Sequence, residues 1–164
     1  LDQNAGDTPC QTREFVAEPL VNLGIDLPDD LEDTAPPAIP TGDGFTIDVV
    51  IGNLEPEGVA GLVAQAVSLQ GTIDTPGVFF AGSSAGNCTI SPDGQTIDCD
   101  FGDFAVGEQR TVTLSFATEP GLLDDGQADI TLSVTTSSEA INEVTEAYLV
   151  RDLRGVRIFR DRFQ

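Results

Sequence analysis

Apolar and polar residues alternate along much of the chain, in short segments separated by turn-forming residues. Every second residue is apolar over 45–51, 112–116 and 128–134. This period of two is typical of β-strands that bury one face. Less regular strand candidates cover 59–69, 78–81, 87–91, 96–101 and 144–150.

Seven or eight short strands without a convincing helix predict an all-β fold, an antiparallel sandwich or barrel. One alternative concerns the segment 58–66. Leu62 and Ala66 are four residues apart, which is also the spacing of neighbours on one face of a short helix.

The composition divides the chain into four parts. The body, 42–150, contains most of the strand candidates. It follows an N-terminal arm, 1–27, and a linker, 28–41, which is acidic and rich in proline and is predicted to form no strand. The tail, 151–164, carries five of the seven arginines: Arg151, Arg154, Arg157, Arg160 and Arg162.

The arm has an alternating segment of its own, which predicts a strand. Its apolar positions are Val21, Leu23, Ile25 and Leu27. Because a linker separates this strand from the body, we expect it to complete the sheet of a neighbouring copy. The tail arginines are expected to dock on the next acidic body. In the alternative, arm and tail both lie on their own chain.

Cys88 and Cys99 flank a predicted hairpin turn that contains Pro92, Asp93 and Gly94. With a two- or four-residue loop the cysteines lie directly opposite each other, at a separation that suits a disulfide. A three-residue loop shifts the register by one and leaves two thiols. We predict the disulfide, which indicates an oxidising compartment, and Cys10 is then free or linked to another chain.

The formal net charge is −21, with 28 acidic residues, 7 basic residues and no histidine. Nucleic acids and anionic membrane surfaces would be repelled by such a chain. No segment approaches the roughly 18 consecutive apolar residues of a membrane-spanning helix. The start at Leu1 is the one expected after removal of a secretion signal. We therefore predict a secreted or cell-surface protein without nucleic-acid partners or membrane insertion.

A carboxylate-rich surface also suits calcium, which prefers oxygen ligands. The candidate ligands are Asp98, Asp100 and Asp103, of which the first two share one face of a strand. No calcium-loop signature accompanies them. We expect no cofactor, with calcium as the alternative, and we interpret these residues as charges that discourage edge-to-edge aggregation.

The composition argues against catalysis. Without histidine or lysine, the commonest general base and the Schiff-base nucleophile are both missing. Ser83 and Ser84 lie in a glycine-rich loop but have no histidine partner. Zinc lacks sufficient histidine and cysteine ligands. A glycosidase that uses only Asp and Glu remains a formal alternative, and the prediction is that the protein is not an enzyme.

Within 86–114 a cysteine, a short hairpin and a second cysteine are followed by Phe101-Gly102-Asp103-Phe104, then by Gly107 and Thr111. This pattern, with the strand that ends at Asn53, resembles a conserved repeat of bacterial and archaeal surface proteins. The resemblance covers about 42–150 and implies an immunoglobulin-like β-sandwich. Members of that family usually form tandem arrays, and one copy is present here. The ending 158–164 is similar to a C-terminal ending of secreted proteins from Gram-negative bacteria.

Together these features predict an extracellular structural protein that binds copies of itself. We expect a subunit of a filament, a pilus-like fibre or a surface layer, assembled by strand exchange between neighbours. The alternative is a monomeric secreted module that is adhesive or binds a ligand, and that calcium stabilises.

Overall fold

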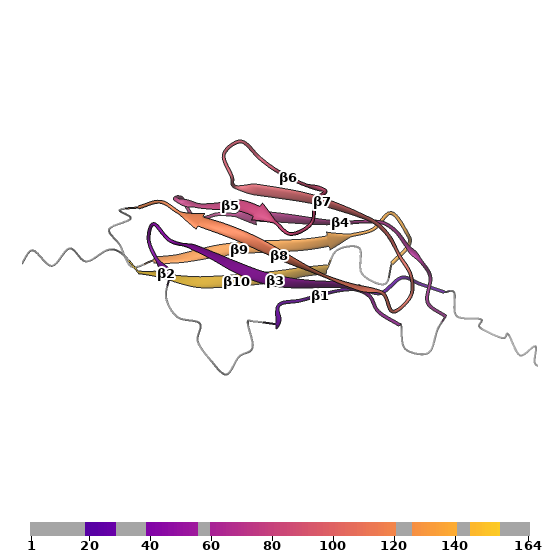
Figure 1. The fold of residues 1–164 in the computed structure, drawn as a ribbon. Coiled ribbons are helices and arrows are strands. Elements are labelled where there is room, and N and C mark those ends of the chain that lie inside the picture. The colour runs from indigo at the N-terminus through magenta and orange to yellow at the C-terminus, as the bar shows by residue number, and fades with distance from the viewer. Residues whose placement is uncertain (1–18, 29–38, 56–59, 121–125, 141–144, 155–164) are drawn as a thin grey trace, which may run out of the picture.

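The structure, a computed structural model, describes residues 19–28, 39–55, 60–120, 126–140 and 145–154. In these residues two β-sheets pack face to face, which confirms the predicted all-β sandwich (Figure 1). One sheet has the order β1-β3-β8-β5, with bounds Leu23–Asp26, Gly44–Asn53, Gln109–Thr118 and Val78–Ser83. The other has the order β2-β10-β9-β4-β7-β6, with bounds Ile39–Pro40, Thr145–Arg154, Gly126–Thr135, Ala64–Ile73, Thr96–Phe104 and Cys88–Ile90.

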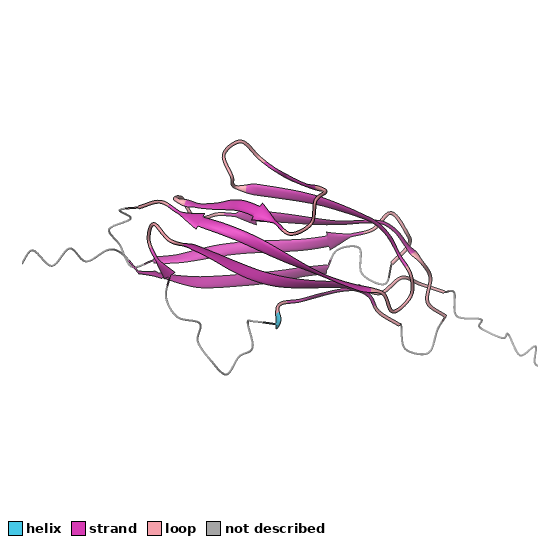
Figure 2. Ribbon diagram, in the orientation of Figure 1, coloured by secondary structure: helices cyan, strands magenta, loops and turns pink. Residues whose placement is uncertain are grey.

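Figure 2 shows how completely strands dominate the described chain, with one short helical turn at Pro28. Neighbouring strands pair antiparallel, except that β2 lies parallel to β10. Within the described ranges, no helix is long and apolar enough to cross a membrane.

The core lies between the two sheets and follows the predicted alternation. The buried positions of β3 and β8 are Ile47, Val49, Ile51, Val112, Leu114 and Phe116. The ring of Phe116 stacks on that of Phe45, with 4.6 Å between the centroids, and lies 5.1 Å from that of Phe80. This aromatic cluster therefore joins β3, β8 and β5 across the middle of the four-stranded sheet.

The alternative of a helix at 58–66 is wrong for the residues of this segment that the structure describes. Residues 60–63 form a loop, and the chain then continues as strand β4. The strand begins at Ala64, later than the predicted 59–69, and its pairing with β7 is irregular between Ala64 and Ser68. Ala66, at this irregularity, has a φ of 48°. From Ser68 onward β4 pairs on both sides, with β7 and β9, which fixes it as a central strand.

Both boundaries of the predicted body shift outward. Ile39 and Pro40, at the end of the predicted linker, form β2 and pair with β10. Proline is tolerated there because β2 is an edge strand. At the other boundary β10 runs to Arg154, since residues 126–129 of β9 need partners, and Arg151 is buried. Arg157, Arg160 and Arg162 lie outside the described residues.

The arm completes the sandwich of its own chain. β1 pairs antiparallel with β3, in a register that puts Leu23 opposite Asn53. Val21 and Leu23 are buried in the core, and Ile25 and Leu27 are half-buried against it. The predicted alternation therefore does place these side chains between the sheets, and the strand that carries them pairs within its own chain, as in the alternative of the sequence analysis.

Candidate interaction surface

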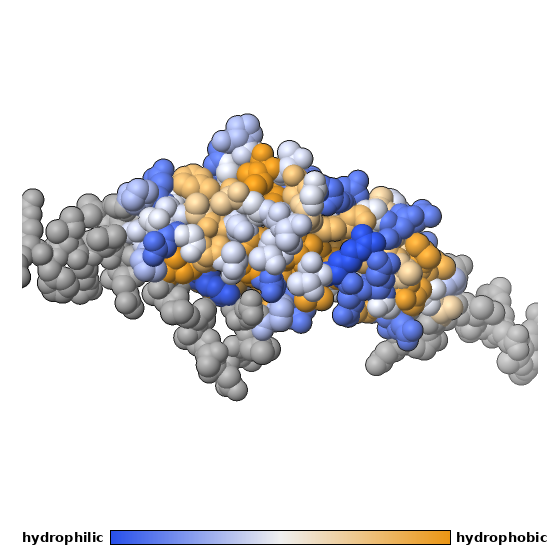
Figure 3. Space-filling model, in the orientation of Figure 1, coloured by the Kyte–Doolittle hydropathy of each residue, from blue (hydrophilic) through white to orange (hydrophobic). Residues whose placement is uncertain are grey.

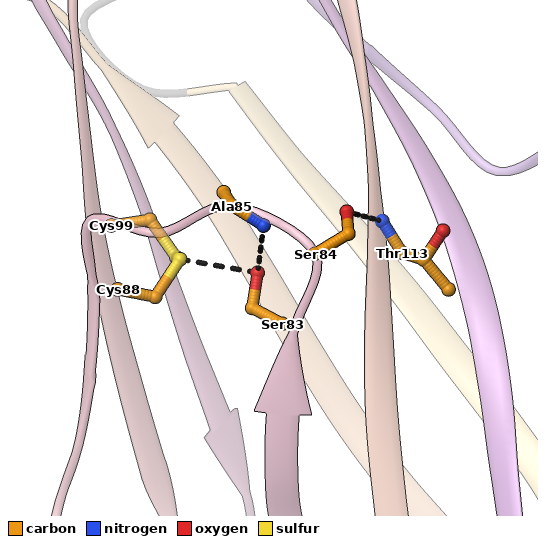
Figure 4. Close-up of a disulfide and its surroundings, with 6 residues drawn as sticks. All are labelled: Ser83, Ser84, Ala85, Cys88, Cys99 and Thr113. Carbon is orange, nitrogen blue, oxygen red and sulfur yellow. Dashed lines mark hydrogen bonds between the residues drawn. A yellow bond between two sulfur atoms is a disulfide. The ribbon is translucent and has the colours of Figure 1, made fainter.

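The structure contains a disulfide between Cys88 and Cys99, with the two sulfur atoms 2.06 Å apart (Figure 4). The cysteines face each other across β6 and β7, in the register expected for an even-numbered loop. The loop is closed by backbone bonds between Ser91 and Thr96 and between Gly94 and Ser91. Gly94 adopts a φ of 71°, which favours glycine. Cys10 lies outside the described residues.

We expect replacement of both Cys88 and Cys99 by alanine to lower the free energy of unfolding by about 2–3 kcal/mol, because a short closed loop restricts the unfolded chain. Urea denaturation measures the loss. The single replacement Cys10→Ala is the matched control and should leave the midpoint unchanged. Peptide mapping without reducing agent should recover the 88–99 link, and a link from Cys10 to either residue would contradict the assignment.

The serines beside the disulfide have structural roles (Figure 4). The Ser83 hydroxyl lies 3.2 Å from the Cys88 sulfur and accepts a hydrogen bond of 3.1 Å from the Ala85 N–H. The Ser84 hydroxyl accepts a bond of 2.9 Å from the Thr113 N–H. The Ser84 bond extends the pairing of β5 with β8 beyond the last residue of β5, whereas the Ser83 bond holds the turn that follows β5; both hydroxyls accept from backbone N–H groups.

The three aspartates proposed as calcium ligands do not converge. The Asp98 carboxylate accepts a bond from the Gln70 amide, Asp100 from the Gly102 N–H, and Asp103 from the Ala66 N–H. Across the part of the chain that the structure describes, no group of three or more His, Cys, Asp or Glu residues could hold a metal ion.

We therefore expect the melting midpoint to be the same in a chelator and in millimolar calcium. A ligand that binds only the folded state must raise the midpoint. The comparison uses magnesium at equal ionic strength as the control, because added salt also screens an acidic surface. A rise that is specific to calcium would contradict the expectation.

Asn53 organises one end of the sandwich. Its amide is buried and donates bonds of 2.8 Å to the Leu62 carbonyl and 3.1 Å to the Phe104 carbonyl. Its backbone bonds Glu108 and Gly107 in the turn between β7 and β8. The end of β3, the loop before β4 and the end of β7 are thereby held together.

Arg110 braces the same turn. Its guanidinium donates bonds to the Phe101 and Asp103 carbonyls and to the Glu108 carboxylate, and it lies 4.3 Å from the centre of the Phe104 ring. Glu108 also accepts a bond from the Ala105 N–H. Several residues that carry the resemblance to surface-protein repeats are thus joined by hydrogen bonds to Asn53 or Arg110, and we call this group the Asn53–Arg110 cluster.

The pKa of Glu108 is lowered, first by the bond from the Ala105 N–H and then by Arg110. A lowered pKa in the folded state means that the carboxylate stabilises the fold above its unfolded pKa, and that this contribution is lost as the pH falls through the folded pKa. We expect Glu108→Gln to be less stable than the parent at pH 7 and equal to it once Glu108 is protonated. Melting midpoints measured from pH 7 down through the folded-state pKa of Glu108 test this expectation. The exposed Glu119→Gln is the control.

Several apolar side chains around the Asn53–Arg110 cluster face solvent. We call Leu54, Leu62, Val63 and Val106 the apolar tip; their exposed fractions run from 37% to 49%. Figure 3 shows apolar atoms gathered at the end of the sandwich where β3 and β7 end (compare Figure 1). By contrast, the outward positions of β4, β7 and β9 carry Ser, Thr, Gln and Asp side chains. Because exposed apolar residues cluster here, we treat this end of the sandwich as the candidate interaction surface.

A small hollow adjoins the apolar tip on the outer face of the four-stranded sheet. Its volume is about 140 Å³, and Gly24 and Gly52, paired across β1 and β3, lie in its lining with Leu54 and Asp26. A Cβ atom on Gly24 would lie 2.8 Å from the Leu54 side chain. The two glycines therefore leave room for Leu54 to lie over the sheet.

Local sequence does not reveal the apolar tip. The pattern over 59–69 predicts that Leu62 and Val63 belong to a strand, and no pattern marks Leu54 or Val106 beside the predicted turns. The available signal was two adjacent apolar residues between glycine 61 and a strand, but this pattern is equally typical of a buried strand start.

No protein-family model matches the chain, and no curated protein matches it significantly in sequence. Among solved structures, the N-terminal domain of the Streptococcus gordonii adhesin Sgo0707 has a TM-score of 0.51 at 15% identity, over 84% of this chain and 33% of that one. A cohesin module of a Clostridium perfringens family 33 glycoside hydrolase has a TM-score of 0.43 at 8% identity, over 84% and 99%. AvmM, which catalyses macrocyclization in alchivemycin A biosynthesis, has 0.47 at 12%, over 83% and 89%. The likeness to the adhesin domain shows a shared fold and leaves function open.

Proposed function

We propose that the protein is an extracellular structural module whose copies associate head to tail, as subunits of a filament, a pilus-like fibre or a surface layer. The observation that carries this is the position of the two ends of the described chain. Leu20 lies at the apolar tip, bonded to Ala60 and Leu62, whereas Arg154 ends β10 at the opposite end of the sandwich (Figure 1). A contact between opposite ends is heterologous, and it makes a fibre when the rotation from one copy to the next does not close a ring.

One property supports an extracellular location: a disulfide between Cys88 and Cys99 is typical of oxidising compartments. The net charge of −21 favours solubility, and the polar outward positions of β4, β7 and β9 suit contact with solvent. We also propose that the protein is not an enzyme, because Ser83 and Ser84 are bonded to the backbone and the chain has no histidine.

Exchange of β1 between neighbours is the proposed route of assembly. A swapped β1 would make the same pairs with β3 as it makes within one chain, and the 12 residues of 27–38, between β1 and β2, span up to roughly 40 Å when extended. Pairing of β1 with β3 of its own chain competes with this exchange. That pairing favours the second candidate function, a monomeric adhesive or ligand-binding module.

The first test is sedimentation and electron microscopy of the full chain. Polymers support assembly, and a protein that stays monomeric at high concentration contradicts it and leaves the monomeric module. A variant that lacks 155–164 tests the part of the tail beyond β10 in the same experiment. It keeps Arg151 and the core, because only residues beyond β10 are removed.

The second test separates strand exchange from other contacts. Asp26 and Val50 are directly opposite on the outer face of β1 and β3, a separation that permits a disulfide. Asp26→Cys with Val50→Cys, made with Cys10→Ser, locks β1 to its own chain when the monomer is oxidised. The reduced form of the same variant is the control. Exchange requires that the oxidised monomer no longer assembles; equal assembly of both forms rejects exchange but leaves head-to-tail contact intact.

A further inference from the structure

We propose that the apolar tip of one copy binds the C-terminal segment 155–164 of the next copy. This rests on the proposed head-to-tail association and names the two surfaces that meet. The apolar tip is an exposed surface near carboxylates. The segment combines one acidic residue, Asp161, with three arginines and four large apolar residues, which are Arg157, Arg160, Arg162, Val156, Ile158, Phe159 and Phe163.

The apolar tip and its surroundings provide complementary groups for such a segment. Leu54, Leu62, Val63 and Val106 offer apolar contacts, and the hollow beside Leu54, of about 140 Å³, is close in size to a cavity of roughly 150 Å³ that holds benzene. A phenylalanine ring is therefore a suitable occupant.

Three carboxylates lie near these apolar groups, and the guanidinium of Arg110 in the same region is already bonded to Glu108. Asp26 lines the hollow, and the exposed Glu55 and Asp103 follow Leu54 and precede Phe104 in the chain. Arginine binds carboxylates through paired, charge-assisted hydrogen bonds. An apolar centre with an acidic rim thus matches a segment in which arginines flank phenylalanines, and it disfavours tip-to-tip contact, which would bring like charges together.

The segment of the same chain does not reach this surface with both phenylalanines. β10 begins beside the apolar tip, where the Thr145 hydroxyl bonds the Leu23 carbonyl, and runs away from it to Arg154. Nine steps along a strand cover about 30 Å. Phe159 is five residues beyond Arg154, a reach of at most about 18 Å. Contact through both phenylalanines therefore requires a second copy.

The test mixes two full-length variants, each defective in one surface. The tip variant is Leu62→Ser with Val63→Ser; the tail variant is Phe159→Ser with Phe163→Ser. Sedimentation velocity measures the self-association of each variant and of a 1:1 mixture. We expect at least about a tenfold weaker self-association for each variant alone, because two apolar contacts are lost at every interface. The mixture should form heterodimers of one tip variant and one tail variant, since each pair retains one intact tip and one intact tail.

Val150→Ser is the matched control, because Val150 is also an exposed valine but lies on the outer face of β10; it should associate as the parent does. Melting midpoints equal to the parent's show that the variants are folded. If the parent assembles and the variants assemble equally well, or the mixture forms no heterodimer, this inference is wrong while head-to-tail association stands. If the parent is monomeric, both are wrong.

Discussion

Leu23→Ala is expected to lower the free energy of unfolding by about 2–5 kcal/mol, the range for removing a buried leucine side chain from a packed core. Leu23 is only 2% exposed and pairs with Asn53 at the edge of the four-stranded sheet. Its carbonyl also accepts a bond from the Thr145 hydroxyl of β10, so the arm touches both sheets. Urea denaturation at low protein concentration measures the loss.

The matched control is Leu62→Ala, the same chemical change at a side chain that is 40% exposed. It should cost well under 1 kcal/mol, since surface substitutions away from special features change stability little. A small effect at both positions would contradict the packing of the arm. If Leu23→Ala lowers stability only at concentrations where the parent assembles, the arm contributes to a neighbour's core, as strand exchange requires.

Asn53→Ala is expected to cost about 2–4 kcal/mol. The buried amide donates to the carbonyls of Leu62 and Phe104, and its removal leaves both without this donor. A buried polar group that loses its partner costs about 1–3 kcal/mol. Thermal or urea melts measure the effect, and Asn87→Ala, at an exposed position, is the control.

The loss of Asn53 should also alter the apolar tip, because the amide joins the loops that carry Leu62 and Val106. Amide hydrogen exchange should rise in residues 60–63 and 104–108 and stay unchanged at the disulfide hairpin. If hydrogen exchange instead rises equally across the whole molecule, Asn53 contributes only to global stability and does not organise the apolar tip.

Local pattern was sufficient to predict the hairpin at 88–99. The turn residues and the cysteines are close in sequence, so one assumption about loop length set the register of β6 and β7. The strands at 45–51, 112–116 and 128–134 are equally predictable from the sequence. Alternation of apolar and polar residues indicates a strand with one buried face, whichever strand is its partner. Sequence alone did not predict that Gly71 of β4 faces the core, where a Cβ would meet Ile97, Phe80 and Leu132 within 3.0 Å.

The sequence by itself determined the properties that depend on neighbours along the chain: the β-strands, the hairpin with its two facing cysteines, the acidity of the body and the arginine-rich tail. Tertiary structure alone decided that the arm pairs within its own chain, that Arg151 belongs to β10, and that Asn53 is a buried donor. It also created the apolar tip, since Leu54, Leu62, Val63 and Val106 become one surface only because β3 and β7 end, and β4 begins, at the same end of the sandwich. Contacts between residues far apart in sequence form when the two sheets pack, and no local pattern specifies them.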